Sequence, residues 1–198
     1  MSGMATVTRE ARSARERLLA AADELFYREG IHSVGIDRII EQAGVAKASL
    51  YKSFRSKDDL VAAYLDSRRR RVTDRVEAAV ARHTDPRDKI LAVFDSQLES
   101  SARPGFNGCA FANATAETHS TTVDEATAHY RQWFLDLFSD LARQAGASDP
   151  VKLGAQLRLL YDGVTQSARI DRDPQAAGQG REVAVVLLDS ALSRPRRR

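Results

Sequence analysis

Apolar residues recur every three or four positions along most of this chain, a spacing that is typical of amphipathic α-helices. We expect a first helix over residues 12–30, because its apolar positions follow that spacing: Leu18, Leu19, Ala22, Leu25 and Phe26. Two short helices, 36–43 and 47–54, are expected next, and Ser56 caps a longer helix that runs from residue 57 to about 83. Residues 1–8 show no periodicity and are expected to form a loose arm.

Cap residues divide the remainder of the chain into further helices. Asp85-Pro86 and Asp149-Pro150 each place an N-cap before a proline at the first helical position, and the stretch from Thr122 to Glu125 matches a capping box. The helices expected from these signals are 86–102, 109–117, 123–145, 150–172 and 175–192, with a loop at 104–108. No alternation typical of a strand is present, so the sequence predicts an all-α fold.

The most informative stretch is residues 36–54. Two short helices joined by a three-residue turn that contains glycine are the signature of a helix-turn-helix, and Gly44 suits the left-handed conformation at the end of the first of them. The second short helix presents small and basic side chains that suit a DNA major groove: Lys47, Ala48, Ser49, Tyr51, Lys52 and Ser53. Spacing alone leaves an ordinary helical hairpin as the alternative.

Residues 12–65 resemble the DNA-binding domain of the TetR family of transcription regulators. The run from Gly44 to Leu60 is similar to the recognition helix of that family and to the start of the next helix, and Ala22-x-x-Leu25-Phe26 before Gly30 is similar to its first helix. The resemblance implies a three-helix helix-turn-helix domain over residues 1–56, joined to a larger helical ligand-binding and dimerisation domain over residues 57–198.

The resemblance also implies which residues meet DNA, with Tyr51 and Lys57 at the phosphate backbone. The expected DNA-binding residues are Gly35, Arg38, Lys47, Ala48, Ser49, Tyr51, Lys52 and Lys57. Two positions depart from the family pattern. Gly35 stands where a Ser or Thr that caps the second helix and touches a phosphate is common, so that contact is expected to be lost or made by the backbone alone. Ile40 stands where a small Ala is usual at the helix crossing, so the crossing is expected to be slightly wider.

Regulators of this family pair through their last two long helices, here 150–172 and 175–192. Apolar residues on these helices support such a homodimer, although they could instead close the core of the subunit: Leu153, Leu157, Leu160, Val164, Val183, Val186, Leu187 and Ala191.

A small-molecule effector is expected between the central helices, where aromatic residues accompany a few polar ones. The candidates are Phe94, Gln97, Leu98, Phe106, Cys109, Phe111, Asn113, Tyr130, Trp133, Phe134, Tyr161 and Gln166. The same aromatic residues could simply form a core.

The stretch from Gly108 to Glu117 also resembles a cysteine-bearing segment of family members that sense electrophiles or oxidants. A thiol at a helix N-terminus is expected to have a lowered pKa. The plain alternative is that Cys109 is a small buried apolar residue.

Charge separates the ends of the chain from its middle. Residues 1–75 carry 15 Lys and Arg against 11 Asp and Glu, residues 76–193 carry 11 against 16, and residues 194–198 include four Arg. A basic DNA-binding domain joined to an acidic second domain accounts for this distribution. One cysteine and no long apolar run favour a cytoplasmic protein that does not enter a membrane.

Motifs for enzymes, metal ions and cofactors are missing from the sequence. It contains no His-Glu-x-x-His, Cys-x-x-Cys or Walker loop, and its four histidines share no ligand spacing. We therefore expect a repressor that a small molecule releases from a pseudo-palindromic operator in double-stranded DNA. The alternatives are a regulator that senses electrophiles through Cys109 and a helical ligand-binding dimer without a DNA function.

Overall fold

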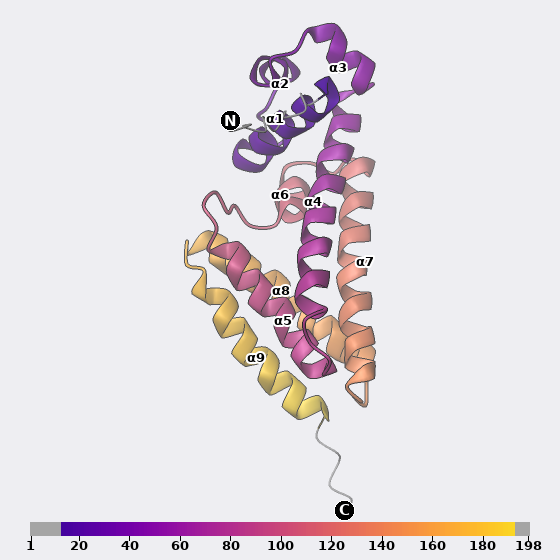
Figure 1. Cartoon of the computed structure of the whole chain (residues 1–198), viewed down its shortest axis with the longest axis vertical. Coiled ribbons are helices and arrows are strands. Elements are labelled where there is room, and N and C mark those ends of the chain that lie inside the picture. Colours follow the sequence, from indigo (N-terminus) through magenta and orange to yellow (C-terminus); the bar gives the residue numbers. More distant parts are fainter. Residues whose placement is uncertain (1–12, 193–198) are drawn as a thin grey trace, which may run out of the picture. The chain divides into compact units, whose positions relative to one another are not determined.

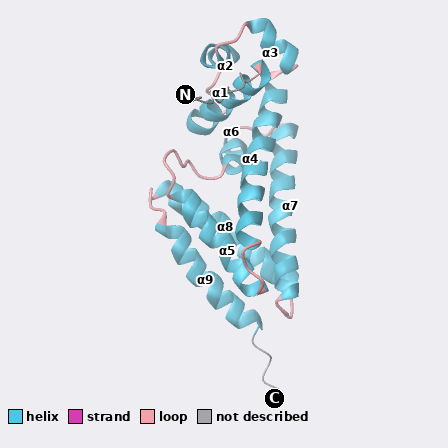
Figure 2. Cartoon of the chain, in the orientation of Figure 1, coloured by secondary structure: helices cyan, strands magenta, loops and turns pink. Residues whose placement is uncertain are grey.

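A computed structural model describes residues 13–192, and every regular element in that range is a helix (Figures 1 and 2). The prediction of an all-α fold is thereby confirmed. The expected arm at residues 1–8 and the arginines of residues 194–198 lie outside the described part. The chain forms two compact units, residues 1–64 and 65–198. The prediction of a domain boundary after residue 56 stays a prediction; the two units divide eight residues later, within α4 (Lys57–Val80).

The first unit contains α1 (Ala14–Glu29), α2 (Ile36–Ala43), α3 (Lys47–Ser53) and the first turns of α4. Helix α1 packs against both α2 and α3. The core between them consists of fully buried aliphatic side chains: Leu18, Leu25, Val34, Ile39, Leu50 and Leu60. Ser13 and Glu16 form a capping box that starts α1 two residues after the expected position, because each side chain accepts a hydrogen bond from the backbone N–H of the other residue.

The turn between α2 and α3 has the geometry that the sequence predicts. Gly44 adopts φ 60° and ψ 43°, in the left-handed region where glycine has no steric penalty. Its N–H and that of Val45 donate to the carbonyl groups of Glu41 and Ile40, which closes the end of α2. The chain can therefore reverse within three residues and begin α3.

The second unit contains the rest of α4 and five further helices. These are α5 (Pro86–Ser101), α6 (Ala110–Glu117), α7 (Thr121–Gln144), α8 (Pro150–Ile170) and α9 (Gln175–Leu192). Helix α8 packs against α7 and α9, α5 contacts all three of them, and α6 packs on α7 (Figure 1). The centre of this unit is aromatic, because Phe94, Phe134, Phe138 and Tyr161 are almost fully buried and contact one another.

The caps of the second unit confirm two predictions and correct a third. Asp85 and Asp149 accept hydrogen bonds from the first turns of α5 and α8, as expected. The predicted capping box at Thr122 is wrong, because Ser120 caps α7 by accepting from the N–H of Val123. Helix α7 therefore begins at Thr121. None of the helices in residues 13–192 is both long and apolar enough to cross a membrane.

Candidate DNA-binding face and ligand pocket

Helix α3 is anchored on one side and open to solvent on the other. Leu50 is fully buried, whereas Lys47, Ala48 and Lys52 are exposed. The ring of Tyr51 is the largest apolar group on the open side, with 55% of the residue exposed. Ser49 is half-buried. The open face therefore combines cations, a small residue and one aromatic ring, the composition expected of a helix that enters a major groove.

Lys47 is not a freely moving cation at the start of α3. Its ammonium lies 3.1 Å from the Asp37 carboxylate of α2, and this hydrogen bond raises the pKa of Lys47. Both side chains are well exposed, so the pair is screened by water. The contact gives Lys47 a preferred direction and puts a carboxylate beside the candidate DNA-binding face.

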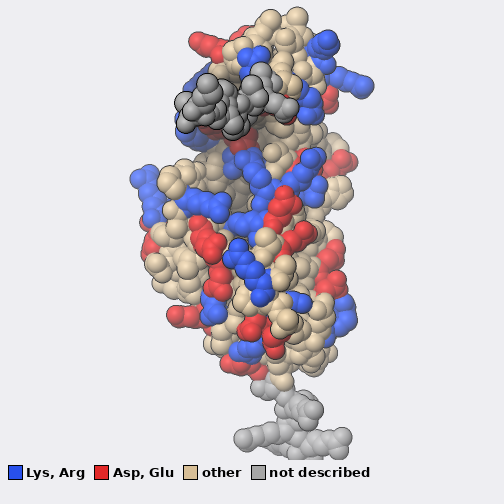
Figure 3. Space-filling view, viewed as in Figure 1, with Lys and Arg blue, Asp and Glu red and all other residues tan. Residues whose placement is uncertain are grey.

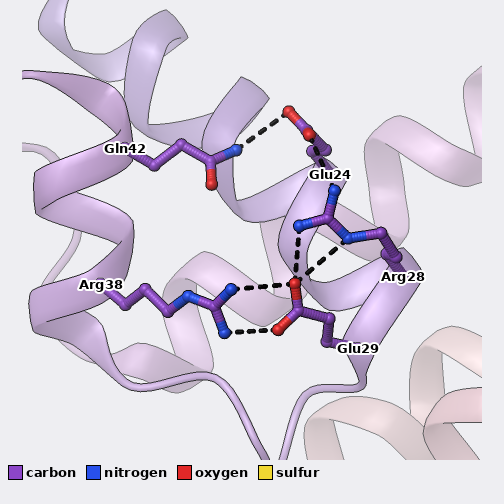
Figure 4. A network of polar contacts seen from close by, with 5 residues as sticks. All are labelled: Glu24, Arg28, Glu29, Arg38 and Gln42. Carbon is purple, nitrogen blue, oxygen red and sulfur yellow. Dashed lines mark hydrogen bonds and ion pairs between the residues drawn. The ribbon is translucent and has the colours of Figure 1, made fainter.

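Arg38 faces α1, where it is held by Glu29 (Figure 4). Both terminal nitrogens of the Arg38 guanidinium donate to that carboxylate, Nη2 at 3.0 Å, and Arg28 donates to it at 2.7 Å. The hydrogen bonds from Arg28 and Arg38 lower the pKa of Glu29. Arg38 thus ties α2 to α1, and it must release Glu29 or share it in order to contact DNA.

Lys57 already has a hydrogen-bond partner, and Gly35 has no side chain with which to bind a phosphate. The Lys57 ammonium donates to the carbonyl oxygen of Ile31 at 2.6 Å, and the residue is half-buried near the ring of Phe26. Two of its three N–H donors remain for other partners. Gly35 occupies the N-cap of α2 without a side-chain cap, and a Cβ atom built there would meet nothing within 4 Å.

Sequence reasoning missed two cations that support the helix-turn-helix. Arg17 on α1 donates to the carbonyl oxygen of Gly44, at 3.2 Å, and the Arg15 guanidinium lies 4.9 Å from the centre of the Phe54 ring. Both contacts join residues that are far apart in the sequence, so no local pattern could have found them. Over the face drawn in Figure 3, basic and acidic side chains are interspersed, and charge alone does not mark a DNA-binding surface there.

A pocket of about 430 Å³ lies in the second unit between α6, α7 and α8. Its lining residues are Cys109, Phe111, Ala112, Thr115, Thr127, Tyr130, Arg131, Tyr161, Asp162, Thr165 and Gln166. The volume falls within the range of roughly 300–1,000 Å³ that is typical of small-molecule sites. All of these residues belong to one compact unit, so the pocket is a feature of that unit alone.

Five of the twelve expected ligand-binding residues line this pocket: Cys109, Phe111, Tyr130, Tyr161 and Gln166. The lining does not include the other seven. Phe94 and Phe134 are core residues that contact the ring of Tyr161, and Gln97 is buried in a polar network. Asn113 donates to the carbonyl oxygen of Asn107. Leu98, Phe106 and Trp133 are half-buried outside the lining.

Comparison with known proteins identifies the family. Residues 18–64 match the model of the bacterial regulatory proteins of the tetR family. SCO4454, a TetR-family transcriptional regulator from Streptomyces coelicolor, is 38% identical, with 91% of this chain and 96% of that chain covered and a TM-score of 0.87. This chain belongs to the TetR family. A putative TetR regulator from Streptomyces avermitilis is 33% identical, with 91% and 98% covered and a TM-score of 0.76.

The match to a transcriptional activator, FasR of Mycolicibacterium smegmatis, is shorter. It is 37% identical over 82 residues, which are 41% of this chain and 37% of FasR, so the chain spans just over a third of that relative. TetR regulators are DNA-binding helix-turn-helix proteins, typically repressors, that act as dimers and are not enzymes. The chain is accordingly a transcriptional regulator.

The cysteine of this TetR regulator does not have the lowered pKa expected of it. Cys109 is the N-cap of α6, and the backbone amides of Phe111 and Ala112 and the hydroxyl of Tyr130 do favour its thiolate. Burial of the sulfur outweighs all of them and raises the pKa of Cys109. The prediction is wrong because it counted the helix terminus and could not count the desolvation.

A polar network connects the pocket of this TetR regulator to α4. The Tyr161 hydroxyl donates to Gln97 Oε1 at 2.8 Å. Burial raises the pKa of Tyr161 to about 12, so that hydroxyl keeps its proton. Arg75 of α4 donates to Gln97 Oε1, to the Tyr161 hydroxyl oxygen and to the Ser96 carbonyl oxygen, at 3.3, 3.4 and 2.6 Å. A change in the position of Tyr161 would therefore alter the hydrogen bonds of α4.

Proposed function

We propose that this chain is a cytoplasmic, ligand-responsive repressor that binds a pseudo-palindromic operator as a homodimer and leaves it when a small molecule binds. The observation that carries the proposal is the open face of α3, where Tyr51 and Lys52 are exposed while Leu50 anchors the opposite side. In this proposal residues 1–56 form the DNA-binding domain and residues 57–198 form the ligand-binding and dimerisation domain.

The DNA contacts are proposed to come from α3 and from the starts of α2 and α4. Lys47, Ala48, Ser49, Tyr51 and Lys52 would enter the major groove, where small side chains allow close approach and cations meet phosphate or guanine. Gly35, Arg38 and Lys57 would contact the DNA backbone beside this groove. Arg38 and Lys57 already bond to Glu29 and to the Ile31 carbonyl, and Gly35 offers only its backbone.

The homodimer is proposed to form through α8 and α9, although several expected contact residues serve another purpose. Leu153, Leu157 and Val164 are buried inside the subunit. Of the expected residues, Val183 and Val186 are exposed, and three further apolar side chains on these helices are exposed as well: Val151, Leu159 and Ile170. Exposed aliphatic residues on two neighbouring helices support pairing with a second copy of the chain.

The response to a small molecule is proposed to run from the pocket to α4. Tyr161 lines the pocket and bonds to Gln97 and Arg75, so an effector that displaces Tyr161 disturbs the hydrogen bonds of α4. Helix α4 continues from the first unit into the second, which makes it the natural element to carry the change. A difference in affinity of about 1–3 kcal/mol between the two states suffices for such coupling.

The DNA-binding part is tested by a gel shift of the intergenic DNA upstream of the chain's own gene across a salt series. Binding should weaken steeply with salt and should prefer this DNA to random duplex, because phosphate contacts release counterions and base contacts give specificity. The double substitution Tyr51→Ala and Lys52→Ala should weaken binding by about 2–4 kcal/mol. Arg82→Ala, which removes an exposed cation from the second unit, is the control and should bind normally.

The outcome separates a repressor from the alternative of a helical ligand-binding dimer without a DNA function. Binding without salt dependence or preference would favour that alternative. Unchanged affinity of the double variant would show that α3 is not the DNA-binding helix.

A further inference from the structure

The pocket between α6, α7 and α8 has aromatic walls. The rings of Phe111 and Tyr130 stack with their centres 4.1 Å apart and their planes 13° apart, and the ring of Tyr161 belongs to the same lining. Aromatic side chains make favourable offset-stacked and edge-to-face contacts with an aromatic ligand, which add to the apolar contact that an aliphatic ligand would also make. The walls therefore favour an aromatic ligand.

The charges of the lining cancel. Arg131 on α7 and Asp162 on α8 are the two charged residues among those that line the pocket, and Arg131 Nη1 lies 2.8 Å from Asp162 Oδ2. Both side chains of the pair are partly exposed. A charged ligand would still have to compete with one member of this pair or remain without a counter-charge beside aromatic rings, and both are unfavourable. The ion pair therefore favours an uncharged ligand.

Two other polar groups of the lining have no partner among the described residues. Thr127 Oγ1 and Gln166 Oε1 are buried and make no hydrogen bond. Thr115 and Thr165 are different, because their hydroxyls donate to carbonyl oxygens of their own helices at 2.9 and 2.8 Å. A buried polar atom without a partner is unfavourable, so Thr127 and Gln166 are the groups that gain most from a ligand.

Thr127 and Gln166 lie on the same side of the ion pair. Thr127 precedes Arg131 by one turn on α7, and Gln166 follows Asp162 by one turn on α8. Consecutive helices that pack along each other, as α7 and α8 do, run in opposite directions, so these two steps lead the same way. One polar edge of a ligand can therefore meet both side chains.

We propose that the effector is an uncharged planar aromatic molecule with one polar edge, which donates and accepts hydrogen bonds between Thr127 and Gln166. This inference rests on the proposed function, because it assigns the chemistry of the molecule that releases the operator. A primary carboxamide has the required edge, since its oxygen accepts and its nitrogen donates.

Four probes test the proposal: 2-naphthamide, 2-naphthoate and 2-naphthamidinium, which have nearly equal shapes, and naphthalene, which lacks the polar edge. Isothermal titration of the full-length chain should give the uncharged amide at least tenfold tighter binding than the anion and the cation. Thr127→Val and Gln166→Leu should each weaken amide binding about five- to tenfold while leaving naphthalene binding unchanged. Gln144→Leu, at an exposed site near the end of α7, is the matched control and should bind the amide normally.

Each other result overturns the proposal. Equal or tighter binding of the anion or the cation would refute an uncharged ligand, and amide binding that survives both substitutions would refute the polar edge. No binding of any probe at millimolar concentration would refute an aromatic site. Circular dichroism checks that each variant is folded. A gel shift on the same preparation without any probe separates the two ideas, because DNA binding there supports the proposed repressor even if the effector chemistry is wrong.

Discussion

Hydrogen bonds within the helix-turn-helix limit which of its side chains are available to contact DNA. Lys47 is paired with Asp37 and Arg38 is held by Glu29, whereas the side chains of Tyr51 and Lys52 are exposed and make no hydrogen bond to another described residue. The pairs that hold Lys47 and Arg38 have no counterpart in a local sequence pattern, because the partners are 10 and 9 residues apart in the chain. The sequence could therefore indicate which residues are basic but not which are already engaged.

Gly35→Ser should strengthen both α2 and DNA binding. Gly35 has an extended backbone at the N-cap and open space around its missing Cβ, so a serine hydroxyl can accept from the first turn of α2. We expect a gain of a few tenths of a kcal/mol in the free energy of unfolding, measured in urea, and tighter operator binding in a gel shift. Gly35→Ala fits the same space without a cap and should lose stability instead. A serine variant less stable than the alanine variant would contradict this reasoning.

Cys109 should react slowly with iodoacetamide near pH 7. Its raised pKa leaves less thiolate than a free cysteine has, and the reaction should accelerate as the pH rises above the ordinary thiol range. Mass spectrometry of the native chain at several pH values measures the rate. The urea-unfolded chain is the reference, since Cys109 is the single cysteine of the sequence. Native labelling at pH 7 as fast as that of the unfolded chain would restore the alternative of a thiol sensor.

The positions of the helices are the feature of this structure that the sequence predicts best. Asp85 and Asp149 stand directly before a proline, a local signal that fixes the start of α5 and α8. The start of α7 was less certain, because Ser120 and Thr122 can both cap a helix and only the backbone geometry selects Ser120. Close contacts between helices could not be predicted at all. The backbone of α8 at Gly154 lies against Ser139 of α7, and nothing near Gly154 in the sequence indicates this approach.

Gly154→Ala should destabilise the second unit. A Cβ atom at this position would lie 2.8 Å from the backbone nitrogen of Ser139, so α7 and α8 would have to move apart. We expect a loss of about 1–3 kcal/mol in the free energy of unfolding, measured by urea denaturation. Gly178→Ala is the matched control, because its Cβ would have ordinary contacts within α9, and the variant should be as stable as the parent or slightly more stable. Equal stability of the two variants would show that the helices adjust without cost.

At the scale of the whole molecule, the sequence predicts which residue types a unit contains better than it predicts which side chains face the core, the pocket or the solvent. Of the aromatic residues expected to bind a ligand, Phe111, Tyr130 and Tyr161 line the pocket, but Phe94 and Phe134 fill the core, and the unpredicted Thr127, Arg131 and Asp162 belong to the lining. On α8, Leu157 is buried and Leu159 is 72% exposed, although both are leucines within one turn. The two lie on opposite faces of α8, because two residues turn a helix by about 200°. Which of these faces packs against α7 and α9 depends on contacts distant in sequence.

Leu159→Glu combined with Val186→Glu should prevent dimer formation. In the proposed homodimer these exposed side chains meet the partner, and burying a carboxylate there is unfavourable. Light scattering coupled to size-exclusion chromatography at about micromolar concentration should show a monomer, with operator affinity reduced at least tenfold. Ala128→Glu adds the same charge to an exposed position of α7 and should leave the dimer intact. A double variant that remains dimeric would place the interface elsewhere.

The Arg75 network restricts how this protein can diverge in evolution. The guanidinium donates to three uncharged acceptors, so lysine, which lacks the planar fork, cannot replace it alone. Loss of the arginine would also leave Gln97 and Tyr161 with a poorer set of partners inside a core. Natural variants should therefore change positions 75, 97 and 161 together, while residues that line the pocket without joining the network can vary independently and adapt the regulator to new effectors.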